Sequence, residues 1–143
     1  MDYNKFLIDT NIIIELLAKR ESFYRDTQNL FTLADGAGTR FQFYISALSF
    51  ANAQYILSKY LNQDEIRENL IKFKPFVRVL PLDDKILELA LASDFSNFED
   101  AIQYYTALEH ELDIIVTRNK KDFKTSDLPV LSAGELWKLI VLR

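Results

Sequence analysis

Three aspartates at distant positions in the chain have the surroundings of a metal-dependent site. Asp9 follows Lys5 and the apolar residues 6–8 and precedes a helical pattern of apolar residues. Asp100 lies in the first turn of an expected helix, and Asp122 comes shortly after the apolar segment 113–117. Carboxylates packed within a few ångströms repel unless a proton or a cation lies between them. Oxygen ligands without His or Cys select a hard ion such as Mg²⁺ or Mn²⁺, which lowers the pKa of a bound water and neutralises charge on a phosphate.

Each aspartate also has an ordinary structural explanation. Asp9 or Thr10 could cap the helix that follows, because both side chains accept hydrogen bonds from first-turn amides. Asn97, three residues before Asp100, resembles a capping pair, and an acid in a first turn is favoured by the helix dipole. Asp122 could be a turn residue. The three acids form a site only if the fold gathers them at one edge of a sheet.

The composition is that of an ordinary globular chain and excludes several kinds of site. With 143 residues, 49% of them hydrophobic and 27% charged, we expect a single domain over residues 1–143. The 17 basic and 21 acidic side chains give a net charge of −4, so contact with nucleic acid needs a local basic patch. There is no Cys and one His, His110, which excludes a thiolate or multi-histidine metal site within the chain. No apolar run approaches the roughly 20 residues of a membrane span and no cleavable signal is seen, so we expect a cytoplasmic protein.

The expected elements alternate strands with helices. The expected strands are 5–9, 41–45, 76–80, 113–117 and 129–131. The expected helices are 11–19, 21–35, one following the serines at 46 and 49, one from near 64 to Pro75, one beginning within 81–84 and ending at 92, then 98–110 and 133–140; a polar loop is expected at 118–124. This alternation predicts a three-layer α/β/α sandwich around a central parallel sheet of about four to five strands. Because their apolar cores suit central positions, the strands 5–9 and 113–117 are expected to lie side by side, bringing Asp9 to the turn Thr117-Arg118-Asn119.

Three segments in this order resemble the PIN-domain family, the nuclease fold of VapC-type toxins. They are residues 7–11 (Leu-Ile-Asp-Thr-Asn) with the apolar helix after them, residues 97–104, and residues 116–123 followed by 129–131. The resemblance covers nearly the whole chain. It implies a PIN-like three-layer fold and a metal-dependent endoribonuclease of the toxin–antitoxin type, which cleaves RNA phosphodiester bonds with a metal-activated water. It also implies Mg²⁺ or Mn²⁺ as cofactor, RNA as substrate, a cognate antitoxin as partner and a homodimer.

The same resemblance assigns roles to individual residues. Asp9 and Asp100 match the family's acidic site, and the loop after the fourth strand places Asn119 or Asp122 where the family carries its last acid or a polar substitute. The residues assigned to catalysis are Asp9, Asp100, Asn52, Asn119 and Asp122. The expected metal ligands among them are Asp9, Asp100 and Asp122. Apart from the resemblance, Thr10, Asn11 and Thr117 are expected to shape the site through hydrogen bonds, and Arg118 and Lys120 are expected to hold a phosphate. These five are the expected substrate-binding residues.

One position departs from the family pattern. The family usually carries a Glu in the pattern Ser-x-Leu-Ser/Thr-x-x-Glu, whereas residues 46–52 read Ser-Ala-Leu-Ser-Phe-Ala-Asn and place Asn52 at the Glu position. Likewise, Asn97 stands where many relatives have Asp. Asn coordinates a cation through its carbonyl oxygen but brings no charge, so metal affinity should fall. The site would then rely on Glu15 or Asp122, or the chain would be a catalytically weakened or inactive PIN-fold module that binds RNA or protein.

Two further interpretations concern the substrate and the class of protein. Tyr104 and Tyr105, one turn beyond Asp100, are expected to stack on a base of single-stranded RNA. A receiver-like domain that takes a phosphoryl group on Asp would also suit a parallel fold with an acidic edge. However, Asp2 lies too early for the paired acid of such a domain, and Lys120 does not follow a receiver-type pattern.

Overall fold

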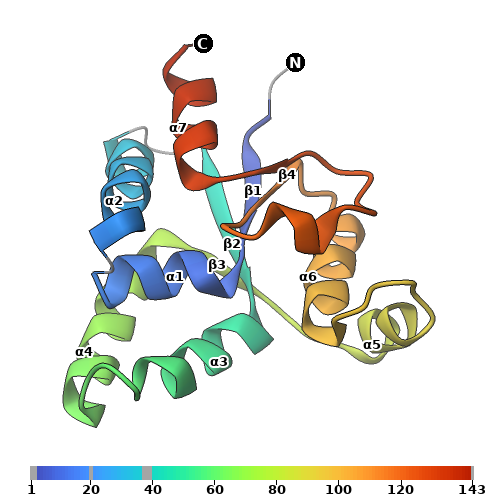
Figure 1. The fold of residues 1–143 in the computed structure, drawn as a ribbon, viewed down its shortest axis with the longest axis horizontal. Coiled ribbons are helices and arrows are strands. Elements are labelled where there is room, and N and C mark those ends of the chain that lie inside the picture. The colour runs from blue at the N-terminus through green and yellow to red at the C-terminus, as the bar shows by residue number, and fades with distance from the viewer. Residues whose placement is uncertain (1–2, 20, 37–39, 143) are drawn as a thin grey trace.

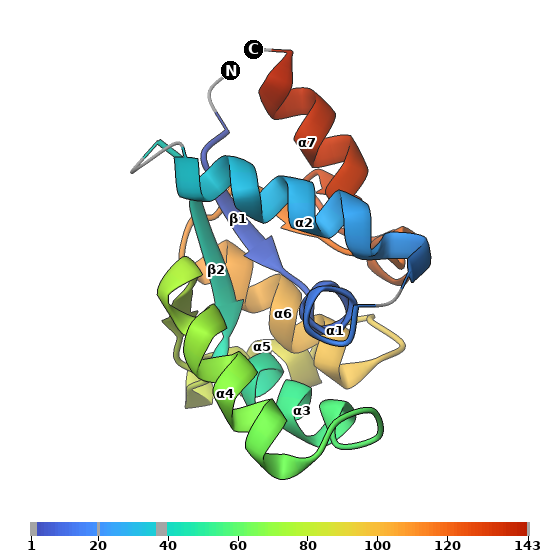
Figure 2. The same ribbon diagram turned by 90° about the vertical axis from the view of Figure 1, so that its left-hand side faces the viewer.

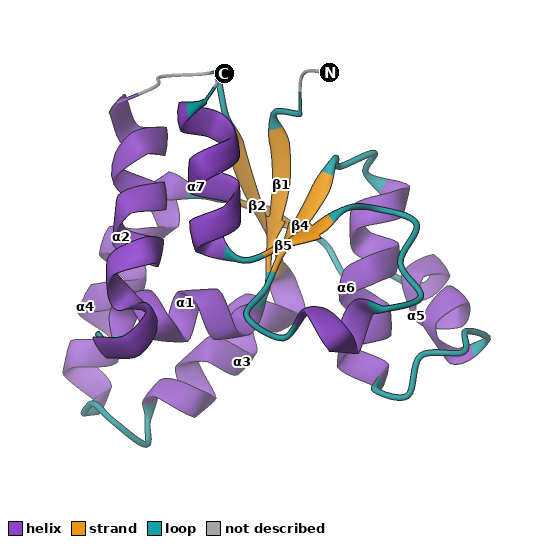
Figure 3. Ribbon diagram, turned by 45° about the horizontal axis from the view of Figure 1, so that its top comes forward, coloured by secondary structure: helices purple, strands orange, loops and turns teal. Residues whose placement is uncertain are grey.

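A computed structural model describes residues 3–19, 21–36 and 40–142. Within these ranges, five strands form one parallel sheet in the order β3-β2-β1-β4-β5, and Figure 3 shows it lying between helices. The strands are β1 (Lys5–Ile8), β2 (Gln42–Ser46), β3 (Arg78–Leu80), β4 (Ile114–Val116) and β5 (Val130–Leu131). The expected parallel sheet is confirmed, with β1 in its middle.

Helices cover both faces of this sheet. In Figure 1, α1, α2 and α7 lie on one side of β1, and α5 and α6 lie on the other. The helices are α1 (Thr10–Leu17), α2 (Glu21–Gly36), α3 (Ala47–Leu57), α4 (Gln63–Phe73), α5 (Asp84–Leu91), α6 (Phe98–Glu109) and α7 (Ala133–Val141), with short 3₁₀ helices η1 (Lys74–Phe76) and η2 (Lys120–Phe123). The three-layer α/β/α sandwich is therefore confirmed. Across the described ranges, the helices are all too short or too polar to cross a lipid bilayer.

The side chains of β1 alternate between the two halves of the core. Phe6 and Ile8 pack into the larger cluster, which includes buried residues of α1, α2 and α7. Leu7 points to the opposite face and packs in a smaller cluster with Tyr104 and Ala107 of α6. All three β1 side chains are fully buried. A strand that is apolar on both faces must be central in a parallel sheet, which is why this short segment directs the whole fold.

The pairing of β1 with β4 brings two polar segments together. Ile8 is in register with Val116, and the Asp9 backbone N–H donates to the Val116 carbonyl at 2.9 Å. The residues that follow these strands, Asp9 and Thr117, therefore lie side by side at the carboxyl edge of the sheet. Ligands of open α/β sheets bind at this edge. The expected adjacency of the first and fourth strands is confirmed.

Two segments differ from their expected local structure. The expected loop at 118–124 contains the 3₁₀ helix η2, because Phe123 is buried at 2% exposure and packs against the α6 side of the sheet. The expected strand 76–80 begins only at Arg78, because Pro75 lies in η1 directly after α4. Proline fits the first turn of a helix, where no backbone N–H is needed, and delays the strand by two residues.

Candidate active site

Asp9 connects β1 to α1, and its side chain both caps α1 and lines a pocket. Its backbone is extended (φ −70°, ψ 155°), and its side chain caps α1 by accepting from the Thr10 backbone N–H at 2.7 Å. The same carboxylate lies in a pocket at the carboxyl edge of the sheet. The capping interpretation is therefore correct for Asp9, and it does not compete with a functional one.

The Asp9 carboxylate is held by side chains from three parts of the chain. Thr117 Oγ1 donates to its Oδ2 at 2.7 Å, and Asn11 Nδ2 donates to the same oxygen at 3.2 Å. Gln103 Nε2 donates to Oδ1, the oxygen that also caps the helix. Burial raises the pKa of Asp9 above its usual value, while the hydrogen bonds from Thr117, Gln103 and Thr10 oppose the rise. The carboxylate is thus fixed in one orientation.

Asp100 faces Asp9 from the start of α6. Asn97 caps this helix by accepting from the Asp100 backbone N–H at 3.1 Å, so the expected capping pair is confirmed. Partial burial, followed by the negative charges of Asp9, Asp122 and Glu99, raises the pKa of Asp100 to about 7. Ionising Asp100 is costly because its carboxyl is partly buried and because other acids surround it. A cation placed among these groups would remove that cost.

These side chains line one pocket of about 240 Å³. The predicted site residues in its lining are Asp9, Thr10, Asn11, Asp100, Arg118, Asn119 and Asp122. Thr117 is fully buried beside them and supports Asp9. Residues that follow β1, residues of α6 and residues that follow β4 therefore meet, as the parallel topology requires.

Lys120 is not part of this lining. Its Nζ lies 3.0 Å from Glu135 Oε1 on α7, and Glu135 closes the capping box of that helix with Ser132. The backbone hydrogen bond from Ser132 and the contact with Lys120 lower the pKa of Glu135. Lys120 therefore fastens η2 to α7.

Asn52 reaches the edge of the pocket through another residue. Its Nδ2 donates to Glu99 Oε1, and Glu99 itself lines the pocket beside Asp100. The sequence interpretation missed Glu99, although it lies within the second motif, next to Asp100. The negative charge that α3 lacks at Asn52 is present on α6 instead.

Gln103 is a second residue that the sequence interpretation missed. It lines the pocket, is only 3% exposed and contacts Asp9. The available signal was its spacing. Residues three apart on a helix share a face, so the side chain at 103 lies on the same face of α6 as that of Asp100.

Glu15 lies outside the acidic pocket. It is 2% exposed, accepts from Thr27 Oγ1 at 3.1 Å and lies 3.4 Å from Arg118 Nη1. The Arg118 backbone N–H also donates to Asn11 Oδ1 at 3.3 Å. Glu15 thus positions Arg118 at the rim of the pocket and does not replace the missing helical acid.

The expected stacking role of Tyr104 is wrong. Tyr104 is 4% exposed, its ring lies 5.2 Å from that of Phe95, and its hydroxyl accepts from the Asp127 backbone N–H at 3.2 Å. Tyr105 packs edge-on against Tyr104 with the ring centroids 5.1 Å apart. Tyr104 belongs to the core between α6 and the sheet, because the helix turns its aromatic face inward.

The donors in the pocket suit a hard divalent cation. They are carboxylate, amide and hydroxyl oxygens, the ligands that Mg²⁺ and Mn²⁺ prefer. In the described part of the chain, no three Asp, Glu, His or Cys side chains form a ready-made metal-binding group. The raised pKa of Asp100 shows that the acids nevertheless sense one another. A cation would therefore need amide oxygens or water in addition to the carboxylates.

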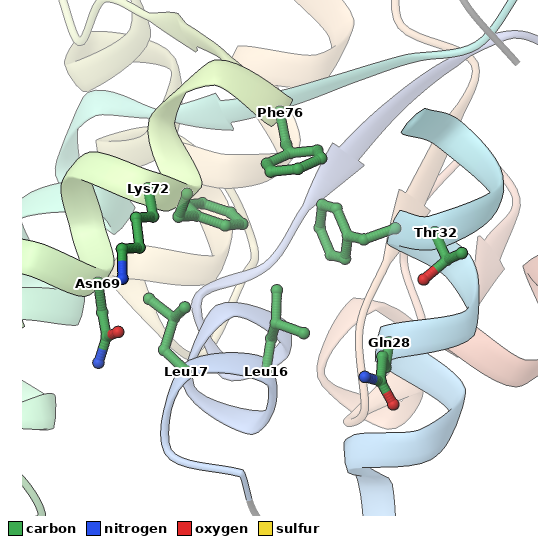
Figure 4. A pocket seen from close by; sticks show the side chains of 9 residues that line it. Leu16, Leu17, Gln28, Thr32, Asn69, Lys72 and Phe76 are labelled. Carbon is green, nitrogen blue, oxygen red and sulfur yellow. The ribbon is translucent and has the colours of Figure 1, made fainter. Parts of the chain in front are cut away.

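A second concavity of about 300 Å³ lies toward the far end of α1 and is mainly apolar. Figure 2 views α1 nearly end-on, with α2 and α4 on either side of it. Leu16 and Leu17 of α1 enter this groove, and Phe76 of η1 closes one end of it (Figure 4). Polar side chains, including Gln28 and Lys72, lie around the apolar lining.

The fold and the pocket define a three-layer parallel α/β protein with an acidic site at the carboxyl edge of its sheet. The family model described as PIN domain matches residues 5–121, and the chain belongs to this family. None of the curated proteins matches the sequence.

Solved structures of toxin–antitoxin proteins share the fold. VapBC2 from Rickettsia felis, bound to a DNA fragment from its promoter, has a TM-score of 0.65 at 21% identity, with 90% of this chain and 97% of that chain covered. A toxin–antitoxin complex from Klebsiella pneumoniae has a TM-score of 0.62 at 27% identity, with 89% and 96% covered. VapC20 from Mycobacterium tuberculosis, described as a sarcin–ricin loop cleaving toxin, has a TM-score of 0.62 at 14% identity, with 77% and 86% covered.

Proposed function

We propose that this chain is a VapC-type endoribonuclease that depends on Mg²⁺ or Mn²⁺. The observation that carries the proposal is the meeting of Asp9, Asp100 and Asp122 in one pocket, where the pKa of Asp100 rises to about 7. Such a pocket attracts a cation because burial and the charges of Asp9 and Asp122 make Asp100 harder to ionise. Membership in the PIN-domain family supports a nuclease, and the neighbour from M. tuberculosis, described as a sarcin–ricin loop cleaving toxin, supports RNA as the substrate.

The residues of the pocket have distinct parts in this proposal. Asp9 and Asp100 would hold the cation, with Asp122 beside them. When bound, the cation lowers the pKa of a water and neutralises charge on the phosphate that is attacked. Thr117 and Asn11 keep the Asp9 carboxylate in place. Arg118, held by Glu15 at the rim, would contact a phosphate of the RNA backbone.

Cleavage of a labelled single-stranded RNA by the purified protein tests the proposal. Activity should require added Mn²⁺ or Mg²⁺ and disappear with EDTA. The Asp9→Asn variant should lose metal-stimulated cleavage, because it keeps the shape of the cap and removes the charge. Asp64→Asn, at an exposed acid in the first turn of α4, is the matched control and should cleave normally. Unchanged cleavage by Asp9→Asn would contradict the mechanism.

A binding module without catalysis is the second candidate. It is favoured by Asn52, and by the lack of a ready-made group of three metal-binding side chains among the residues described. Calorimetry with Mn²⁺ separates the two candidates. Absence of binding at millimolar Mn²⁺, together with binding of RNA that is not cut, would favour the module.

The partner that we propose is an antitoxin that occupies the apolar groove. The neighbours from R. felis and K. pneumoniae are complexes of a toxin with its antitoxin. A mainly apolar concavity between α1, α2 and α4 suits an amphipathic helix or strand of a partner. The product of the reading frame next to this one is the chain to test for binding.

A further inference from the structure

We propose that Gln103 is a ligand-switching residue of the metal site: its amide holds Asp9 when the site is empty of metal and turns its carbonyl oxygen to the cation when one binds. The inference rests on the proposed function for the presence of a metal site, and it adds a residue to that site. It needs no RNA for its test.

Gln103 is placed where such an exchange can occur. It lines the same pocket as Asp9 and Asp100 and is 3% exposed. Its Nε2 donates to Asp9 Oδ1. Its Oε1 is also buried and has no hydrogen-bond partner among the residues described. A buried carbonyl oxygen left in this way is uncommon, because buried polar groups are nearly always paired.

The contact between Gln103 and Asp9 follows from the charge of Asp9. A carboxylate accepts hydrogen bonds, so only the NH₂ end of an amide can face it in the absence of a cation. The donors Thr10 and Gln103 reach Oδ1, while Asn11 and Thr117 reach Oδ2. Since a carboxylate offers about four lone-pair positions, a cation that binds Asp9 must displace one of these donors.

Gln103 is the donor best able to leave. The Thr10 bond is made by the backbone of α1 and caps that helix. Thr117 also accepts from the Asn119 backbone N–H at 3.1 Å, and Asn11 also accepts from the Arg118 backbone N–H at 3.3 Å, so both are tied to the segment after β4. The Gln103 amide has no such second bond through its oxygen within the described structure. A half-turn of this planar group exchanges its nitrogen and oxygen with little change of shape.

The exchange would answer two needs of the site at once. It would give the buried Oε1 the cation as a partner, while Nε2 leaves Asp9 and moves to the position that Oε1 held, and it would add an uncharged oxygen to a site in which carboxylates alone do not form a complete group. Amide oxygens are ordinary ligands of hard cations.

Mn²⁺ binding measured by calorimetry on three variants tests the inference. Gln103→Met keeps the length of the side chain and removes both polar atoms, so Mn²⁺ should bind about 10-fold or more weakly. Gln103→Glu keeps an oxygen toward the cation and adds a charge, so Mn²⁺ should bind more tightly than to the wild type. Gln54→Met removes a surface amide whose Nε2 donates to Gln63 Oε1 at 3.0 Å, away from the site, and should leave binding unchanged.

The Met variant tests whether the amide matters to the cation, because a residue that only packs predicts an unchanged Mn²⁺ affinity when its length is kept. The tighter binding expected of Gln103→Glu also reflects its added charge, so the crystal structure with Mg²⁺ described below decides whether the side chain ligates. Equal weakening, or an affinity of Gln103→Met within twofold of wild type, would overturn the inference.

A crystal structure of the wild-type protein grown with Mg²⁺ gives a reading that does not depend on the folding of the variants. Gln103 Oε1 should lie at about 2.0–2.1 Å from the ion. An occupied site in which Nε2 still donates to Asp9 would overturn the inference.

The two proposals fail in different ways. A wild-type protein that binds Mn²⁺ and cuts RNA, with Gln103 variants of unchanged affinity, contradicts only the role of Gln103. Opposite shifts in Mn²⁺ affinity without RNA cleavage contradict only the nuclease. A wild-type isotherm without Mn²⁺ binding contradicts both.

Discussion

Asn52 of α3 donates a hydrogen bond to Glu99 of α6, so an amide and a carboxylate from two helices meet at the edge of the acidic pocket. Asn52 occupies the position where the PIN pattern usually carries a Glu. Glu99 therefore brings a negative charge to the place where α3 lacks one. This relationship yields a direct test of how the charges of the site are distributed.

Replacing Asn52 by Glu should tighten Mn²⁺ binding and destabilise the metal-free protein. The new carboxylate would face Glu99, and the repulsion would be relieved by a cation. A unit charge about 4 Å from another is worth about 1 kcal/mol even in water, so an increase of roughly fivefold or more in affinity is expected. Calorimetry and thermal unfolding with EDTA measure the two effects. The double variant Asn52→Glu/Glu99→Gln exchanges the charge between the helices, so its Mn²⁺ affinity and its thermal stability should return toward wild type. If the affinity of the single variant does not rise, Asn52 lies outside the site.

Mn²⁺ affinity should fall as the pH drops below about 7. The pKa of Asp100 is raised to about 7 by burial and by its acidic neighbours, so below that pH a proton competes with the cation. The affinity should approach a tenfold loss per pH unit well below 7 if Asp100 alone titrates. Titrations between pH 5.5 and 8 measure the slope. Asp100→Asn should bind weakly and lose the part of this dependence that Asp100 supplies, while any part due to the raised pKa of Asp9 remains. A wild-type slope that starts only near pH 4 would contradict the assignment.

The raised pKa of Asp100 should also make the stability of the protein, measured without metal, decrease as the pH rises. A carboxyl whose folded-state pKa is raised from 3.8 to about 7 stabilises the fold below pH 3.8 relative to higher pH, and this contribution is lost as the pH rises through 7. Urea unfolding with EDTA should therefore show Asp100→Asn gaining stability over wild type as the pH rises from 4 to 8. A constant difference between the two proteins would indicate that Asp100 titrates normally.

A charge in the apolar groove should weaken antitoxin binding without affecting the acidic pocket. Phe76 is 42% exposed at the end of the groove (Figure 4), so Phe76→Glu should fold and leave a carboxylate against an apolar partner. We expect at least a tenfold weaker complex with the product of the adjacent reading frame, measured by calorimetry after co-expression and separation. Leu91→Glu, at a 73% exposed residue of α5, is the matched control. Equal binding by both variants would remove the groove from the interface.

Much of the fold was predictable because the central strands are short and wholly apolar. Residues 6–8 and 114–116 have no polar face, so they had to be covered on both sides and adjacent in a parallel sheet. Asp9 and the segment from Thr117 follow these strands, and the predicted meeting of their side chains follows from that adjacency. Local patterns also predicted the caps, because Asn97 and Ser46 act on backbone amides only a few residues away.

Predictions that depended on side-chain direction were less successful. The polar segment after β4 was expected to be a loop, but a single buried aromatic, Phe123, folds it into η2. Tyr104 was expected at the surface beside the site and lies in the core instead. In both cases the composition of the segment is compatible with either position, and packing against α6 decides.

The sequence alone determined the order of the elements, the apolar strands in the middle of the sheet, and the edge at which Asp9, Asp100 and Asp122 meet. These follow from local hydrophobic patterns and from the geometry of parallel strands. Only the tertiary structure decided that Gln103 holds Asp9, that Glu99 pairs with Asn52, and that Lys120 turns to α7. The physical reason is that hydrogen bonds between distant side chains depend on the angle at which packed helices meet the sheet, which no local pattern specifies.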